Sequence, residues 1–243
     1  MCGIAGFCLS ADEKVDAPQL SRSLLREIMS RGKDATGAAW VEYDKTAGKT
    51  KVVVSKAPVA ATRFDPFLKT MPMWTRRAIL HTRWATKGDP QNNLNNHPIV
   101  SGSVIGVHNG VLSNDDALFA HLPVMRHGEV DSEAAFALLD YTKHHPANVL
   151  ESLRGRAALA WFDANDKRDL HLARVSGSPL VVGQTYGNSL VFASTMPLLV
   201  KAIANTRLEL QWVEEIGEST YLRVRDGKIE DCYSIDRSVK EIA

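Results

Sequence analysis

The chain begins Met1-Cys2-Gly3-Ile4-Ala5-Gly6-Phe7, and the rest of the sequence is best interpreted from this stretch outward. Aminopeptidases remove an initiator methionine when a small residue follows, and removal would leave Cys2 with a free α-amino group beside its own thiol. An α-amino group titrates near ~8 and a thiol near ~8.5, so this one residue would supply both a nucleophile and a base. Taken alone, Cys2 is equally well an ordinary small residue at a chain start.

Composition and charge narrow the class of protein. The 243 residues are enough for one large domain with a substantial core, and no repeat or linker divides them, so we expect a single domain over residues 1–243. Lys and Arg (29) nearly balance Asp and Glu (28), and no basic run is interleaved with aromatic residues, which argues against a nucleic-acid surface. No apolar run approaches the ~20 residues that span a bilayer, and the first ten residues lack the charged region of a signal peptide.

Cysteine usage indicates the compartment. The three cysteines, Cys2, Cys8 and Cys232, are an odd number without a CxxC pair, so neither a disulfide framework nor a zinc site is expected. A reducing cytoplasm is the predicted location. On a strand, Cys2, Ile4, Gly6 and Cys8 would share one face, so Cys8 is expected to be a small buried residue.

The order of helix and strand patterns predicts an α+β fold of layers. A strand over Gly3–Leu9 precedes a helix that starts at an Asp16 N-cap and stops near Gly32. The pattern further predicts helices at Thr62–Met73, Asp131–Tyr141 and Pro197–Ala204, and strands at Gly37–Tyr43, Lys51–Ser55, Arg77–Arg83, Val104–His108, Ala157–Asp163, Leu170–Val175, Pro179–Gly183, Leu190–Ser194, Leu208–Val213, Thr220–Arg225 and Lys228–Ser234. Many short strands between few helices favour antiparallel sheets over alternating βαβ units.

Four further clusters stand beside the first stretch, each where an element starts or stops. They are Arg31-Gly32-Lys33-Asp34-Ala35-Thr36-Gly37, His81-Thr82-Arg83-Trp84-Ala85-Thr86-Lys87-Gly88, Val107-His108-Asn109-Gly110 and Glu129-Val130-Asp131-Ser132-Glu133. An amide-rich loop, Gly88–Asn96, follows the second cluster, and loops of this composition are often functional.

Together with Cys2-Gly3-Ile4-Ala5-Gly6, these clusters resemble the class II glutamine amidotransferases, which are N-terminal-nucleophile hydrolases. The resemblance is strongest to the glutaminase domain of glucosamine-6-phosphate synthase, and it includes Ser176-Gly177-Ser178-Pro179-Leu180-Val181-Val182-Gly183. It runs from residue 2 to about residue 230. It implies a four-layer αββα sandwich in which two antiparallel sheets lie between layers of helices.

The resemblance also implies a role for each motif residue. Cys2 is the nucleophile that attacks the side-chain amide of L-glutamine, and Asn109 and Gly110 hold the oxyanion. Arg83 binds the α-carboxylate and Asp131 the α-ammonium. Trp84 and Thr86 belong to a lid that closes over glutamine. Arg31 ranks below these residues, because a structural role in holding the nucleophile strand explains it as well.

Each of these residues also has an ordinary structural interpretation. Asn109-Gly110 is the sequence of a type I′ hairpin turn, and Asp131 suits a helix N-cap. Arg83 could form a surface ion pair and Trp84 could be a core aromatic residue. His81, His97 and His108 suggest a metal site or a Cys–His pair, but no carboxylates accompany them at ligand spacing, so structural histidines are favoured.

We therefore expect an enzyme without a metal or cofactor that hydrolyses L-glutamine through a Cys2 thioester. No acceptor domain is recognisable in the sequence, so ammonia is expected to pass to a separate protein. The alternatives are an N-terminal-nucleophile amidohydrolase acting on another γ-glutamyl amide and a non-catalytic module of the same fold. Lys87 stands where the resembled domain usually has histidine, which puts the coupling to an acceptor in doubt.

Overall fold

The computed structural model describes residues 1–44 and 48–238. Its helices are α1 (Ala17–Ile28), α2 (Asp65–Leu68), α3 (Asp115–Ala120), α4 (Ser132–Thr142), α5 (Pro146–Leu150) and α6 (Met196–Ala204). Its strands are β1 (Gly3–Cys8), β2 (Ala35–Asp44), β3 (Lys49–Ala57), β4 (Arg77–Arg83), β5 (Ile99–Ser101), β6 (Val104–Leu112), β7 (Gly155–Asp163), β8 (Asp169–Ser176), β9 (Val181–Thr185), β10 (Leu190–Ala193), β11 (Leu210–Glu215), β12 (Thr220–Arg225) and β13 (Lys228–Ser234).

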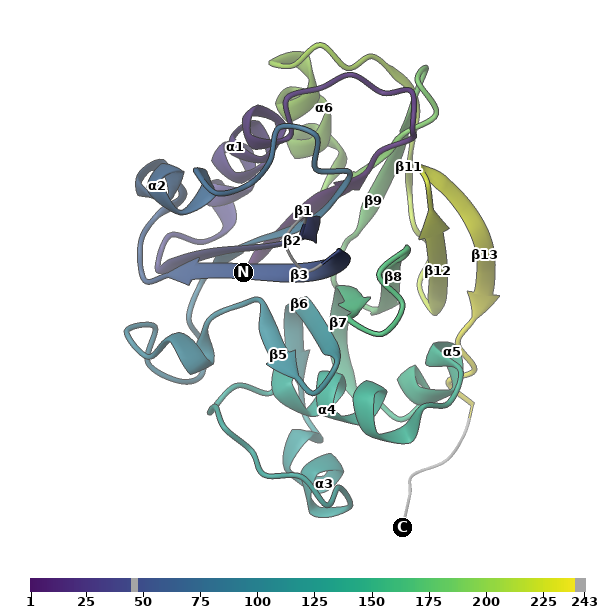
Figure 1. Cartoon of the computed structure of the whole chain (residues 1–243). Coiled ribbons are helices and arrows are strands. Elements are labelled where there is room, and N and C mark those ends of the chain that lie inside the picture. The colour runs from purple at the N-terminus through teal and green to yellow at the C-terminus, as the bar shows by residue number, and fades with distance from the viewer. Residues whose placement is uncertain (45–47, 239–243) are drawn as a thin grey trace.

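The strands form two antiparallel sheets that pack face to face between two layers of helices (Figure 1). The seven-stranded sheet has the order β11-β9-β10-β1-β4-β2-β3, and the six-stranded sheet has the order β13-β12-β8-β7-β6-β5. Helices α1, α2 and α6 cover the outer face of the first sheet, and α3, α4 and α5 lie beyond the second. This is the predicted αββα sandwich.

Alternation of side chains along the strands explains the layers. On β1, Ala5 and Phe7 face α1 and α6, whereas Ile4 and Cys8 enter the core between the sheets. A strand with both faces buried must be apolar throughout, as Gly3–Cys8 is. The predicted shared face of Ile4 and Cys8 is confirmed, and it places Cys2, the next residue in that alternation, at the rim of the inter-sheet core.

The first helix shows why local sequence was a good guide to its boundaries. Asp16 Oδ1 accepts a hydrogen bond from Gln19 N at 2.8 Å, which confirms the predicted N-cap. The buried face of α1 carries Leu20, Leu24, Leu25 and Ile28. A 3₁₀ turn, Met29–Arg31, ends the helix just before Gly32.

Three expectations about the elements were wrong. The helix expected over Thr62–Met73 is only the short α2, because Pro66 occupies its first turn and the chain continues irregularly toward Pro72. The strand β6 does not break at Asn109-Gly110 but continues to Leu112, paired with β7 throughout. The type I′ turn interpretation of that dipeptide is therefore wrong as well. Helices α3 and α5 and the short strand β5 were not predicted.

The other predicted strands and the helix at Pro197–Ala204 are present, with ends shifted by up to a few residues. Asp226 and Gly227 both have positive φ (48° and 83°), as a tight hairpin turn between β12 and β13 requires. The connection between the predicted strands Gly37–Tyr43 and Lys51–Ser55 includes residues 45–47, which lie outside the described residues. Within the described part of the chain, no helix is both long and apolar enough to cross a membrane.

A buried histidine in the second sheet predicts how stability changes with pH. His171 on β8 stacks on Trp161, its Nδ1 lies 2.8 Å from the Tyr221 hydroxyl, and burial lowers its pKa to about 4. An unfolded histidine titrates near ~6.5, so between pH 6.5 and 4 the unfolded chain binds the extra proton. The free energy of unfolding should therefore fall as the pH falls through this range, by up to ~1.4 kcal/mol per pH unit from this residue.

Chemical denaturation at several pH values checks this expectation. The variant H171F should show a shallower fall over that range, and H121F, which replaces an exposed histidine, should keep the wild-type slope. Equal slopes in wild type and H171F would contradict the assignment to His171.

Candidate functional site

The position of Cys2 is fixed by the first residues of β1. Gly3 pairs with Thr82 on β4, and the Thr82 hydroxyl donates to Ile28 O at 2.8 Å. A Cβ on Gly3 would lie 2.6 Å from both Ile28 O and Thr82 Oγ1, so glycine is required for this close approach of α1 and β4. The half-buried Cys2 thus lies directly beside the end of β4.

Two residues of the Arg31–Gly37 cluster form hydrogen bonds that hold Cys2 and the end of β4 in place. Arg31 Nε donates to Cys2 O at 2.8 Å. Asp34 accepts from Ala85 N through its carboxylate (2.7 Å) and donates its backbone N–H to Arg83 O (3.0 Å). Arg31 therefore holds the chain just before β1, which is a structural role, and Asp34 holds the chain immediately after β4.

The surroundings of the Cys2 thiol favour its protonated form. Burial raises the pKa of Cys2, and the negative charge of Asp131 acts in the same direction, whereas the chain's terminal ammonium and Arg83 lower it. The Sγ atom lies 3.6 Å from Trp84 O. A thiol kept neutral in this way needs a proton acceptor before it can attack.

Asn109 and Gly110 lie on β6, in the sheet opposite Cys2. His81 Nε2 on β4 is 3.1 Å from His108 O, which joins β4 and β6 directly at this level. Asn109 is buried, and its Nδ2 has no hydrogen-bond partner among the described residues. Gly110 has φ of 152°, and a Cβ there would meet Arg156 O at 1.8 Å. A buried amide donor without an acceptor is costly, so Asn109 Nδ2 is a candidate donor to a water or a ligand.

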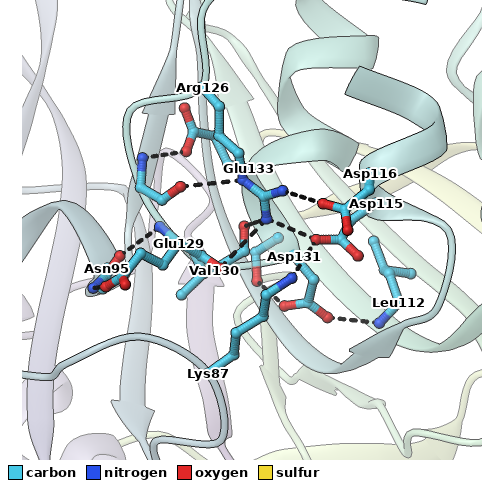
Figure 2. A network of polar contacts seen from close by, with 12 residues as sticks. Lys87, Asn95, Leu112, Asp115, Asp116, Arg126, Glu129, Val130, Asp131 and Glu133 are labelled. Carbon is cyan, nitrogen blue, oxygen red and sulfur yellow. Dashed lines mark hydrogen bonds and ion pairs between the residues drawn. The ribbon is translucent and has the colours of Figure 1, made fainter. Parts of the chain in front are cut away.

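Asp131 occupies the predicted N-cap position of α4, but its carboxylate does not cap the helix. Its backbone is helical (φ −60°, ψ −29°), and its side chain makes no capping hydrogen bond. Instead Asp131 Oδ2 accepts from Leu112 N at the end of β6, at 2.6 Å (Figure 2). This bond places the carboxylate beside the strand that carries Asn109 and leaves further lone pairs for a ligand.

Arg83 is buried and turned into the loop of residues 84–96, here called the lid loop. Its Nη2 donates to Lys87 O (2.6 Å) and Gly88 O (2.9 Å), and its Nη1 donates to Asn96 Oδ1 (2.8 Å). These bonds use three of the five guanidinium N–H groups, so Nε and one N–H of Nη1 stay free for a carboxylate. The surface ion-pair interpretation of Arg83 is wrong.

Trp84 and Thr86 lie exposed at the start of the lid loop. Trp84 is therefore not a core aromatic residue. It lines a cavity of about 280 Å³ together with Met1, Ser30 and Arg31, immediately outside Cys2. Thr86 is exposed in the same loop, and its role in a lid stays a prediction.

His81, His97 and His108 are buried between the sheets and the loop of residues 84–96. His108 Nδ1 lies 2.8 Å from Ser132 Oγ, and the rings of His81 and His97 are tilted against each other with their centroids 4.2 Å apart. Burial lowers the pKa of all three, that of His81 to about 3, so they stay neutral. His81 Nδ1 and both ring nitrogens of His97 are buried without a partner among the described residues.

The structure also contains site residues that the sequence interpretation did not name. Asp34 and Asn96 hold Arg83 and the lid loop, and a network of Lys87, Asn95, Asp115, Arg126 and Glu129 lies behind Asp131 (Figure 2). The density of amides in the lid loop was a signal for Asn95 and Asn96. No sequence signal indicated Asp115 and Arg126, because their contacts join segments that only the fold brings together.

The chain is similar in sequence to known proteins. Residues 81–201 match the model of a glutamine amidotransferase domain. The glutamine–fructose-6-phosphate aminotransferase of Photorhabdus laumondii is 32% identical over 209 residues, covering 82% of this chain and 32% of that protein. The one from Vibrio cholerae is 28% identical over 253 residues, covering 99% of this chain and 39% of that protein. The chain thus spans about a third of the length of these relatives.

Solved structures agree on the fold. Glutamine phosphoribosylpyrophosphate amidotransferase from Bacillus subtilis superimposes with a TM-score of 0.76 at 19% identity, over 98% of this chain and 50% of that one. The αββα sandwich that starts with a cysteine-bearing strand is the fold of the N-terminal-nucleophile hydrolases. Within that fold, the chain is similar to the glutamine amidotransferases, which confirms the predicted resemblance to the glutaminase domain of glucosamine-6-phosphate synthase.

The raised pKa of Cys2 predicts the pH dependence of its alkylation in the chain that retains Met1. Because burial disfavours the thiolate, the rate of reaction with iodoacetamide should rise with pH at a midpoint above the ~8.5 of an exposed cysteine peptide. The variant D131N removes a charge that raises this pKa, so its midpoint should be lower than that of the wild type. Peptide mass mapping assigns the label to Cys2. A wild-type midpoint at or below that of the peptide would contradict the expectation.

Proposed function

We propose that this chain hydrolyses the side-chain amide of L-glutamine to glutamate and ammonia through a γ-glutamyl thioester on Cys2. The observation that carries the proposal is the buried, unpartnered Nδ2 of Asn109, on the strand that faces the Cys2 end of β1. The family of the chain and the charges of Arg83 and Asp131 near the thiol support it.

The attacking group is generated by loss of Met1. In the chain that retains Met1, the nitrogen of Cys2 is a peptide nitrogen and cannot accept a proton. Hydrolysis of that peptide bond frees an α-amine, which then takes the thiol proton. The neutral thiol favoured by burial becomes a thiolate only as it attacks the amide carbon.

The remaining residues hold the substrate and its developing charge. The free N–H groups of Arg83 bind the α-carboxylate, and Asp131 accepts from the α-ammonium. When the thiolate adds to the amide carbon, the oxygen becomes an oxyanion that accepts from Asn109 Nδ2 and the Gly110 N–H. The tetrahedral intermediate collapses, the amine proton goes to the leaving nitrogen, and ammonia departs. Water then cleaves the thioester, which releases glutamate and regenerates the thiol.

Trp84 and Thr86 close the lid over bound glutamine in this proposal. Exclusion of bulk water would protect the site until ammonia has left. The acceptor of the ammonia is proposed to lie outside residues 1–243. A reducing cytoplasm remains the predicted compartment, because a nucleophilic thiol must stay reduced.

Replacing the nucleophile tests the proposal directly. The variant C2A should lose ammonia release from L-glutamine entirely, while glutamine still protects the protein against thermal unfolding, because Arg83 and Asp131 remain. An assay of ammonia together with intact mass, with and without 6-diazo-5-oxo-L-norleucine, reports turnover, loss of Met1 and labelling of Cys2. C232A, which replaces an exposed cysteine, is the matched control.

Retained turnover in C2A, or active protein that still carries Met1, would contradict the proposal. Absence of turnover of free glutamine in wild type, combined with turnover of another γ-glutamyl amide, would instead identify the alternative amidohydrolase.

Removing the oxyanion donor tests the role of Asn109. N109A should lower kcat by ~10²–10³ with a much smaller change in KM, because the bond forms fully only in the transition state. Alkylation of Cys2 by iodoacetamide should continue, since that reaction forms no oxyanion at this position. N205A, at the C-terminal end of α6, is the control. A loss of less than about tenfold would contradict the role of Asn109.

A further inference from the structure

The lid loop and the segment that leads into α4 are joined by a reciprocal pair of hydrogen bonds. Asn95 Oδ1 accepts from Glu129 N at 2.8 Å, and Asn95 Nδ2 donates to Glu129 Oε2 at 2.7 Å (Figure 2). Asn95 is completely buried, whereas Glu129 is exposed, so the pair is buried on the side of the loop. Two hydrogen bonds therefore link the two segments at this position.

A second connection is made of charges, here called the charge clamp: Lys87, Asp115 and Arg126. Lys87 Nζ and Arg126 Nη2 both donate to Asp115 Oδ2, at 2.7 and 2.6 Å. The Asp115 side chain is only 8% exposed. Burial opposes its charge, but the bonds from Lys87 and Arg126 outweigh burial and lower its pKa. The carboxylate is thus ionised and paired on both sides.

Arg126 also forms hydrogen bonds to the backbone of the residues that precede Asp131. Its Nε donates to Gly128 O at 3.1 Å, and its Nη2 also donates to Glu129 O (3.3 Å) and Val130 O (3.1 Å). From the other side, Glu133 accepts from Gly128 N at 2.7 Å. The three carbonyls that precede Asp131 are therefore fixed by one guanidinium, which is itself fixed by Asp115.

Lys87 contacts both Arg83 and Asp115. Its backbone carbonyl accepts from Arg83 Nη2 at 2.6 Å, while its side chain donates to Asp115. A continuous path of contacts thus runs from Arg83 through Lys87, Asp115 and Arg126 to Asp131. Under the proposed function, on which this inference rests, Arg83 and Asp131 bind the two opposite charges of the α-amino acid.

We propose that Lys87 is a positioning residue that sets the spacing between Arg83 and Asp131, and thereby selects amide substrates that carry both an α-carboxylate and an α-ammonium group. A substrate with only one of these charges needs only one anchor, so the spacing between the anchors does not matter to it. A surface lysine–aspartate pair of no consequence would not distinguish the two kinds of substrate.

The test compares three amides on wild type, K87M, K87R and K143M. L-Glutamine carries both charges, glutaramate lacks the ammonium and 4-aminobutanamide lacks the carboxylate. K87M should raise KM for L-glutamine about fivefold, with kcat changed less than about twofold, because only binding is lost. K87R restores the charge and should bring KM back toward the wild-type value.

K143M is the matched control, because Lys143 makes a similar ion pair with Asp140 (2.9 Å) at the far end of α4. It should leave every constant unchanged. The kcat/KM values for glutaramate and 4-aminobutanamide should be equal in wild type and K87M. Iodoacetamide alkylation of Cys2, which uses neither anchor, reports whether each variant keeps the site folded.

The outcomes separate this inference from the proposed function. If wild type releases no ammonia from glutamine, both are overturned. If wild type is active but K87M has an unchanged KM, or loses activity alike on all three amides, the positioning role alone is overturned. A fall in kcat with unchanged KM would overturn it too.

Discussion

The position of β1 at the centre of the seven-stranded sheet is the constraint on which the site depends. The strand pairs with β4 on one side and β10 on the other, and both of its faces are buried. Gly3 and Gly6 allow this tight arrangement, because a Cβ on Gly6 would meet Ala78 O at 2.2 Å and the ring of Phe192 at 2.4 Å. A strand enclosed on four sides cannot shift in register, so the residue just before it has a fixed place.

The side of the site that β6 forms is also rigid, because its residues are paired within a sheet. Asn109 and Gly110 lie within β6, where hydrogen bonds to β7 continue on both sides of them. The two candidate donors to an oxyanion are therefore part of a sheet, whereas the groups proposed to bind the α-carboxylate and α-ammonium lie at element ends and in loops. Preorganisation is greatest where charge would develop, and adjustment is left to the parts that recognise the substrate.

The sequence predicted the layers and most elements because their signals are local. The Asp16 cap, the periodic leucines of α1 and the alternation of Gly3–Cys8 each act within a few residues. The turn predicted at Asn109-Gly110 was wrong, because the pairing of β6 with β7 overrides the preference of this dipeptide for a turn. Asp131 stands at the predicted N-cap position of α4, but its carboxylate accepts from a β6 amide at 2.6 Å instead of capping the helix. The roles of Asp115 and Arg126 could not be predicted, because their contacts arise only when α3 and the segment before α4 are folded together.

The hydrogen bond from Arg31 to Cys2 O has a consequence for the proposed removal of Met1. In that proposal Cys2 becomes a chain end, and chain ends ordinarily fray. Fraying would lower the effective concentration of the thiol at the substrate amide and so reduce the advantage of a preassembled site. The bond from the Arg31 guanidinium would hold the carbonyl of the new first residue in place of the lost peptide bond. This contact is already present in the chain that retains Met1.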